Sequence, residues 1–269
     1  MPVHPTAIVD ATAEIDPTAE IGAYAIVERN VRIGAETRLY AHAYVAEGTT
    51  LGRGCQIHPF AVVGHLPQDL KFPGEPSYTE VGDETVVREH ATIHRGTVPG
   101  STTVVGPRCF IMSTSHVGHN CVLGAGVVIV NGGLLAGHVQ VGDRAFISGS
   151  AGVHQFCRIG ELAILSGLCR VPKDVPPFML LGPAGIVGLN VVGLRRAGFT
   201  SAERLELRQC HRILYRSGLH FPEAIERVSG MVETEPGRRL VAFLLAPSKR
   251  GYMGYKPRRV VREPDEELA

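Results

Sequence analysis

Several features are scarce in this chain, and each scarcity argues against a class of protein. The chain has no tryptophan, and aromatic residues make up only 6% of its 269 residues. No apolar run is long enough to cross a membrane, and the start, MPVHPTAIVD, lacks the layout of a signal peptide. The formal net charge of +1 provides no overall field that would attract nucleic acid. We therefore expect a cytoplasmic protein with no membrane span and no nucleic-acid partner.

An aliphatic residue at every sixth position organises the chain. This phase runs from Val3 to Val171 and has 29 positions, of which 26 hold Val, Ile or Leu. The three exceptions are Asp69, Glu75 and Pro99. A period of six is neither helical nor a simple strand alternation. It is typical of hexapeptide repeats that coil into a parallel β-helix, with the aliphatic side chains inside.

The fifth position of the hexads holds a small residue except at Pro67 and Pro73, and we expect this residue to fit the corner between two flat faces. Three hexads make one coil, so the 29 hexads predict roughly ten coils stacked at the spacing of neighbouring strands. Five of the six cysteines occupy this position: Cys55, Cys109, Cys121, Cys157 and Cys169. We expect them to be buried thiols that pack the corners, and we expect no disulfide, no metal site and no cofactor.

Two interruptions of the repeat predict loops that leave the β-helix. Residues 64–80 lose the pattern but keep its phase, which predicts that one coil's worth of chain is looped outward. Residues 96–103 form a second, shorter excursion. A loop that leaves a rigid scaffold is a common place for function, although a tolerated insertion would look the same.

The composition changes after Val171, where a proline-rich stretch ends the repeat. Thr200 and Glu203 have the spacing of a capping box, and an apolar side follows in Leu205, Cys210, Ile213 and Leu214. Further helices are expected from about residue 222 to 235 and from about 236 to 245. The expected division is a β-helix over residues 1–186 and a C-terminal α-helical domain over 187–269, whose tail from Lys249 frays.

The first of these helices carries arginine at every fourth position, in Arg204, Arg208, Arg212 and Arg216. This spacing places four guanidinium groups in one stripe along the helix. The stripe is either an ordinary solvated face or a docking site for an acidic partner.

Residues 18 positions apart lie one above the other in neighbouring coils, so the repeat predicts which side chains meet. His119 should lie directly beneath Gly137, and Asn120 beneath His138. A histidine about 5 Å from a glycine N–H is a base beside a donor that could stabilise an oxyanion. Three more histidines, His116, His138 and His154, occur in the same segment and favour a functional cluster over chance.

Longer motifs make the chain resemble a known family. They are QDLK (68–71), TIHRGTV (92–98), SHVGHNC (115–121), LAGHV (135–139), VHQFC (153–157), DVPP (174–177), GLRRAGF (193–199) and LYRSG (214–218). Together they resemble the UDP-N-acetylglucosamine O-acyltransferases, which catalyse the first step of lipid A biosynthesis. The resemblance covers nearly the whole chain. It implies a left-handed β-helix, a homotrimer with sites at subunit boundaries, and two substrates, an acyl carrier protein thioester and a UDP-sugar.

The resemblance also implies roles for particular residues. His119 would be the general base that takes a proton from the sugar 3-hydroxyl, and the Gly137 N–H would stabilise the oxyanion. The residues expected to bind the substrates are Gln68, Asp69, Lys71, His94, His116, His138, His154, Gln155, Asn190 and Arg196. The position of Gly167 limits acyl chain length in the family, and glycine there implies a groove that accepts a long 3-hydroxyacyl chain.

Two positions depart from the family pattern. Asn120 stands where an aspartate usually follows the catalytic histidine, and Ala197 stands where a further basic residue is usual. An amide oxygen can still fix the imidazole tautomer, although it stabilises an imidazolium less than a carboxylate does. The sequence leaves open whether the acceptor sugar carries a 3-hydroxyl or a 3-amino group.

Two other readings compete with acyl transfer. A γ-class carbonic anhydrase uses the same β-helix with three histidines on zinc, and it would contain bound metal. A binding protein that kept the fold and lost catalysis is the other alternative, and Asn120 is its best support. An acyl-transfer assay combined with a zinc measurement separates the three readings.

Overall fold

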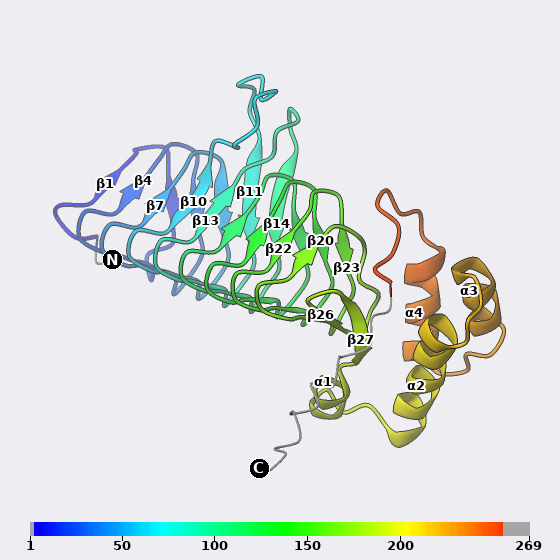
Figure 1. The fold of residues 1–269 in the computed structure, drawn as a ribbon. Coiled ribbons are helices and arrows are strands. Elements are labelled where there is room, and N and C mark those ends of the chain that lie inside the picture. The colour runs from blue at the N-terminus through cyan, green and yellow to red at the C-terminus, as the bar shows by residue number, and fades with distance from the viewer. Residues whose placement is uncertain (1–2, 255–269) are drawn as a thin grey trace, which may run out of the picture.

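The computed structural model describes residues 3–254 as an elongated prism of short parallel strands with helices at its C-terminal end (Figure 1). Each hexad supplies a strand and a tight turn, so successive strands join three different sheets in rotation. Strands in one sheet are therefore parallel and usually 18 residues apart, as in the pairing of Val27 with Val45. The expected fold class, a β-helix of hexapeptide repeats followed by helices, is confirmed.

The chain enters the three sheets in the order I, II and III. Sheet I contains β1 (Ile8–Val9), β4 (Ile26–Val27), β7 (Tyr44–Val45), β10 (Val62–His65), β13 (Thr92–His94), β16 (His116–Val117), β19 (Leu134–Leu135), β22 (Gly152–Val153) and β25 (Arg170–Val171). Sheet II contains β2 (Glu14–Ile15), β5 (Arg32–Ile33), β8 (Thr49–Leu51), β11 (Tyr78–Val81), β14 (Thr102–Val105), β17 (Val122–Leu123), β20 (Gln140–Val141) and β23 (Arg158–Ile159). Sheet III contains β3 (Glu20–Ile21), β6 (Arg38–Leu39), β9 (Gln56–Ile57), β12 (Val86–Val87), β15 (Phe110–Ile111), β18 (Val128–Ile129), β21 (Phe146–Ile147), β24 (Ile164–Leu165), β26 (Met179–Gly182) and β27 (Gly185–Leu189).

The core follows the two repeat positions found in the sequence. The aliphatic residues of the hexads are buried from Ile21 to Val171, and the small residues at the corners are buried between them. The five corner cysteines are buried free thiols, as predicted, and burial raises the pKa of Cys121 to about 12. A thiol with so high a pKa stays protonated and behaves as a small apolar residue.

The loops are shorter and the coils fewer than the sequence suggested. Val63 pairs with Ile93, 30 positions later, so the first loop adds 12 residues rather than a whole coil of 18. Val81 pairs with Val105, 24 positions later, so the second loop adds 6. The three positions that broke the aliphatic pattern, Asp69, Glu75 and Pro99, lie in these two loops. Because the inserted hexads form no strands, sheets I and II contain nine and eight strands instead of the expected ten.

The β-helix ends just after the proline-rich stretch of residues 171–183. Strand β26 continues sheet III in parallel with β24, and β27 then turns back antiparallel to β26. The expected domain boundary after residue 186 therefore falls inside β27. Helix α1 (Val191–Arg196) follows directly and leads into the helical end of the molecule.

Three longer helices form that end. Helix α2 (Ser201–Arg216) begins at the predicted capping box of Thr200 and Glu203, helix α3 covers Phe221–Ser229, and helix α4 covers Glu235–Leu245. Helix α3 ends at Ser229, earlier than expected. Leu205 was placed on the apolar side of α2 but is 52% exposed, and Leu207 is buried in its place. The tail expected to fray lies mostly outside the described residues; its first part, up to Gly254, contacts the β-helix.

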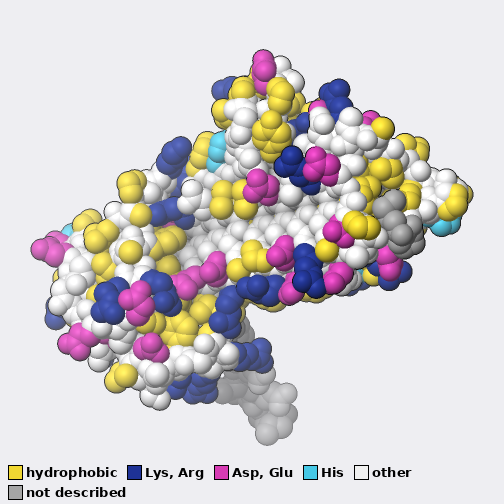
Figure 2. Space-filling model, turned by 180° about the vertical axis from the view of Figure 1, so that it is seen from behind, with side chains coloured by type: hydrophobic (Ala, Val, Ile, Leu, Met, Phe, Trp, Pro, Cys, Tyr) yellow, Lys and Arg dark blue, Asp and Glu magenta, His cyan; other side chains and the backbone are white. Residues whose placement is uncertain are grey.

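The surface carries mixed charge. Figure 2 shows acidic and basic side chains beside one another along the prism, and the first loop stands out from it. Several of these pairs are ion pairs between stacked coils, such as Arg32 with Glu14 and Arg38 with Glu20. No helix within residues 3–254 is long and apolar enough to cross a membrane.

Candidate active site

The turn between β16 and β17 carries the histidine that the sequence singled out. Asn120 takes the left-handed conformation of this turn, with φ 58°, which asparagine tolerates better than most residues. The next coil stacks on this turn through a hydrogen bond from the His138 N–H to the His119 carbonyl oxygen, 2.9 Å long. The predicted stacking of the two turns is therefore present.

The hydrogen bonds of Asn120 fix the tautomer of His119. Asn120 Oδ1 accepts from the Thr97 backbone N–H at 3.0 Å, and Asn120 Nδ2 donates to Ser101 Oγ at 2.8 Å. Because a backbone N–H can only donate, the atom that faces Thr97 is the amide oxygen. His119 Nδ1 lies 3.0 Å from the same oxygen and must carry the proton in a neutral ring. The other nitrogen, Nε2, is then unprotonated and free to accept a proton.

Gly137 brings a backbone donor against this ring. A Cβ built on Gly137 would lie 2.3 Å from both Nε2 and Cε1 of His119, so only glycine fits beneath the imidazole. The Gly137 N–H has no hydrogen-bond acceptor in the described part of the chain. A base and an unpaired backbone donor therefore face the same space, which is the arrangement that acyl transfer requires.

That space is a cleft of about 780 Å³ along sheet I. Among the predicted site residues it is lined by Gln68, His94, His116, His119, Gly137, His154 and Gln155. Its floor between the histidines and Arg170 is apolar, formed by Leu134, Gly152 and their neighbours.

Two histidines of the cleft are neutral near physiological pH. Burial, and after it the neighbouring His116, lowers the pKa of His94 to about 4. Burial and the nearby His119 also lower the pKa of His116, whose Nδ1 lies 2.8 Å from Thr92 Oγ1. The buried Nδ1 of His94 has no hydrogen-bond partner among the described residues, and His94 belongs to the lining of the cleft.

The first loop reaches His119 from outside the prism. Asp69 places a carboxylate oxygen 3.9 Å from His119 Nε2, and its other oxygen accepts from the Lys71 backbone N–H at 3.0 Å. The side chain of Lys71 is exposed and does not belong to the cleft lining. The loop therefore brings Gln68 into the lining and Asp69 beside His119.

His138 lies beside the cleft rather than in its lining. Its ring is perpendicular to that of His119, with 5.1 Å between centroids, and the ring of Phe156 stacks on it at 4.7 Å. Burial lowers the pKa of His138, and the charges of His119 and Lys249 add to this effect. His138 is therefore placed to support the ring of His119.

Three other predicted residues lie away from the cleft. Asn190 and Arg196 line a separate hollow of about 580 Å³, beside Phe146 and Ile164 of sheet III. The Asn190 side chain caps helix α1 by accepting from the Gly193 N–H and donates to the Leu162 carbonyl oxygen. Gly167 is exposed, and a Cβ there would meet only the Gly149 carbonyl oxygen, at 3.3 Å. Its role in limiting the acyl chain stays a prediction.

Sequence reasoning missed the residues that hold Asn120. Thr97 and Ser101 belong to the second loop and bond the Asn120 side chain from two directions. Thr97 keeps the small-residue position of the hexad and is 8% exposed, although the loop interrupts the repeat around it. A small residue at the corner position inside a loop was therefore the sequence signal that could have identified Thr97.

A β-helix of hexapeptide repeats with a histidine, a backbone donor and an external cleft is the architecture of the bacterial hexapeptide transferases. Residues 30–65 and 102–137 match the bacterial transferase hexapeptide family. Residues 174–253 match the second domain of UDP N-acetylglucosamine O-acyltransferase.

Relatives cover almost the whole chain. The acyl-[acyl-carrier-protein]–UDP-N-acetylglucosamine O-acyltransferase of Thermodesulfovibrio yellowstonii is 42% identical over 93% of this chain and 98% of its own. The enzyme of that name from an Anaeromyxobacter species is 50% identical over 85% of this chain and 90% of its own. The chain therefore belongs to the UDP-N-acetylglucosamine O-acyltransferase family.

Solved structures agree with this assignment. The UDP-N-acetylglucosamine O-acyltransferase of Moraxella catarrhalis is 40% identical over 93% of this chain and 99% of its own, with a TM-score of 0.89. The acyltransferase of Bacteroides fragilis is 37% identical over 93% and 99%, with a TM-score of 0.90. The coverage includes both the β-helix and the helical end.

Proposed function

We propose that this chain carries out the reaction of its family with His119 as the general base. The reaction transfers a 3-hydroxyacyl chain from acyl carrier protein to the 3-hydroxyl of UDP-N-acetylglucosamine, the first step of lipid A biosynthesis. The observation that carries the proposal is the contact of His119 Nδ1 with the amide oxygen of Asn120, which leaves Nε2 as the acceptor of a neutral ring beside Gly137, whose N–H has no acceptor in the described part of the chain. Gln68 and Asp69 from the loop, with His94, His116, His154 and Gln155, would hold the sugar nucleotide in the cleft.

The proposed steps need only groups that the cleft contains. Nε2 of His119 takes the proton of the sugar hydroxyl while the hydroxyl oxygen attacks the thioester carbon. The Gly137 N–H donates to the oxyanion of the tetrahedral intermediate. When the intermediate collapses, the C–S bond breaks and the imidazolium returns its proton to the carrier's thiolate. Asn120 Oδ1 accepts from Nδ1–H throughout and keeps the ring oriented.

Replacing His119 with Ala tests the assignment of the base. The substitution should lower turnover by about 10² or more, the range of a positioned general base, and leave the fold intact. Turnover of purified protein and its circular dichroism spectrum provide the measurement. Activity close to wild type in the variant would overturn the assignment.

Chelation separates acyl transfer from the zinc alternative. No three His, Cys, Asp or Glu side chains within residues 3–254 are grouped so as to hold a metal ion. We expect turnover to be the same before and after treatment with a chelator. Loss of activity that added zinc restores would favour the metal-dependent reading instead.

The proposed active form is a homotrimer with sites between subunits. Two observations support it: Asn190 and Arg196 lie in a hollow apart from the cleft, and an apolar strip runs along sheet III beside that hollow. The strip is formed by stacked outward side chains of Val86, Phe110, Val128, Phe146 and Ile164. Packed against the cleft of a second copy, the strip would bring Asn190 and Arg196 to the substrate.

A further inference from the structure

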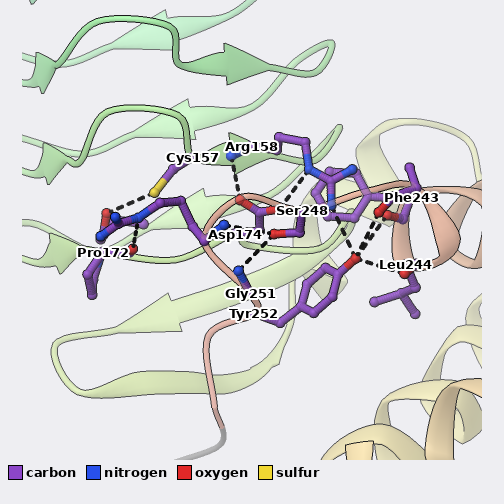
Figure 3. Close-up of polar contacts among 12 residues, drawn as sticks. Cys157, Arg158, Pro172, Asp174, Phe243, Leu244, Ser248, Gly251 and Tyr252 are labelled. Atoms are coloured by element: carbon purple, nitrogen blue, oxygen red, sulfur yellow. Dashed lines mark hydrogen bonds and ion pairs between the residues drawn. The ribbon is translucent and has the colours of Figure 1, made fainter. Parts of the chain in front are cut away.

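The chain returns to the β-helix after helix α4, through residues Ser248–Met253, called the strap here (Figure 3). The strap pairs with the last coil by two backbone hydrogen bonds, from the Asp174 N–H to the Gly251 oxygen and from the Met253 N–H to the Asp174 oxygen. Arg250 Nε adds a hydrogen bond to the Pro172 carbonyl oxygen at 3.1 Å. Pro172 belongs to the lining of the catalytic cleft, so the strap reaches the rim of the site.

A buried ion pair fixes the position of the strap. Arg158 Nε lies 2.7 Å from a carboxylate oxygen of Asp174, whose side chain is fully buried. Arg158 also donates to the hydroxyl oxygen of Tyr252 at 3.1 Å, and that hydroxyl donates to the Leu244 carbonyl oxygen at 2.7 Å. Breaking such a pair would leave a buried charge unpaired. The strap is therefore held in one register on the β-helix.

This register places the ammonium group of Lys249 over an aromatic ring. Lys249 Nζ lies 4.5 Å from the centroid of Phe156, within range of a cation–π interaction. The ring of Phe156 also stacks on His138, with 4.7 Å between centroids, and the ring of His138 is perpendicular to that of His119, with 5.1 Å between centroids. A continuous column therefore runs from the strap to the proposed base.

We propose that Lys249 is a positioning residue of the acyl-transfer site, which acts on His119 through Phe156 and His138. The inference rests on the proposed role of His119 as the base. The cation orients the ring of Phe156 and, through it, the ring of His138. Its charge also opposes a second positive charge on His138, which would otherwise compete with the imidazolium that forms on His119.

The charges that face His138 determine the sign of the effect. They are His119 and Lys249, which disfavour a proton on His138, and Asp69, which favours one. Without the charge of Lys249, the pKa of His138 rises toward its ordinary value, so His138 binds a proton at a higher pH. A cationic His138 opposes proton transfer to His119, so the loss of rate should grow as the pH falls.

Three variants and a control test the proposal through the pH dependence of kcat. Lys249→Met should lower kcat about five-fold relative to wild type at pH 6 and change it little at pH 8. Lys249→Arg keeps the charge and should keep the wild-type profile. Phe156→Leu removes the ring between the cation and His138 and should also lower kcat most at low pH. Lys173→Met removes an exposed lysine next to Asp174 in the chain. It should leave the pH profile of kcat unchanged.

Other outcomes would overturn the proposal. A loss in Lys249→Met that is equal at pH 6 and pH 8, or is shared by Lys249→Arg, would make the contact merely structural. No change at either pH would remove Lys249 from the reaction, and the same shift in Lys173→Met would point to general surface charge. The His119→Ala variant separates this proposal from the proposed function. If His119→Ala is inactive while Lys249→Met has the wild-type kcat at both pH values, only the role of Lys249 fails.

Discussion

Asn120 shows how much one turn residue decides in this site. Its backbone adopts the left-handed conformation that the turn requires, and its amide joins the second loop to the ring of His119. The amide supplies the acceptor that sets the tautomer but has no charge to stabilise the imidazolium. Asparagine therefore meets the geometric requirement of the site without the electrostatic contribution of a carboxylate.

Replacing Asn120 with Asp should preserve turnover or raise it by a few-fold, because a carboxylate accepts the same hydrogen bonds and stabilises the imidazolium in the transition state. Ser101 Oγ accepts from Asn120 Nδ2 at 2.8 Å and donates to the Val98 carbonyl oxygen at 2.6 Å, so its hydroxyl would have to leave Val98 in order to donate to the carboxylate. Steady-state kinetics at saturating concentrations of both substrates measure the change. A large fall in kcat would show that the Asn120 N–H contributes to catalysis in another way.

Replacing Gly137 with Ala should displace the base. The new Cβ would lie 2.3 Å from two atoms of the His119 ring, so the imidazole must move out of line. A displacement of about 1 Å in a catalytic group can cost roughly 10²-fold in rate, so kcat should fall by about that factor. Gly188→Ala is a suitable control, because a Cβ there meets nothing within 4 Å. Equal kcat in the two variants would remove Gly137 from the site.

The arginines of helix α2 form one stripe along the helix. Arg208 and Arg212 are exposed, whereas Arg204 donates to the Phe199 carbonyl oxygen and to Ser201 Oγ beside the start of the helix. The stripe predicted from the four-residue spacing is therefore present on the surface, but Arg204 also supports the helix end. Arg216 is exposed as well, and the exposed arginines are the part that can meet an acidic carrier protein.

Reversing the charge of Arg208 and Arg212 to Glu should raise the KM for the acyl carrier protein donor by about ten-fold. It should also weaken the dependence of that KM on salt, because attraction between opposite charges is lost. The KM for the sugar nucleotide should not change. Reversing Arg32 and Arg38, at the other end of the prism, alters net charge equally and is the control. An unchanged donor KM in the α2 variant would identify the stripe as an ordinary solvated face.

The whole molecule shows an asymmetry between its outer faces. Sheet III carries the continuous apolar strip, whereas the outward residues of sheet II include Arg32, Glu80, Gln140 and Arg158. Exposed apolar side chains that form a continuous strip are a common mark of a subunit contact. The face that bears the strip is therefore the one expected to be covered in the assembly.

Phe146→Glu should break the assembly. The wild-type chain should have a solution mass near three times 28.9 kDa by light scattering, and the variant should dissociate and lose most of its activity. Phe146 is 36% exposed in the single chain and lies between Val128 and Ile164 in the strip. Val122→Glu, at a 46% exposed position on sheet II, is the matched control and should remain trimeric. A wild-type chain that is monomeric and fully active at nanomolar concentration would contradict the proposal.

The repeat alone determined the coil, the buried core and the meeting of His119 with Gly137. Wherever the hexads are unbroken, a residue 18 positions later must lie in the next coil, because every hexad advances the chain by one face. The same rule predicted that the turn containing His138 stacks on the turn containing Asn120. The fifth position of the hexads predicted the buried cysteines. The family motifs then supplied the reaction, which periodicity by itself does not specify.

The tertiary structure decided the contacts between segments that share no period. Loops of 12 and 6 added residues bring Asp69 and Thr97 to the base, and their reach depends on how each loop folds back on the prism. The same is true of the strap, where Lys249 meets Phe156 only because Arg158, Asp174 and Tyr252 fix the strap's register. Within the β-helix, the separation of two residues in the sequence determines whether they are neighbours. Loop closure and docking depend instead on side-chain packing between segments that are distant in the sequence.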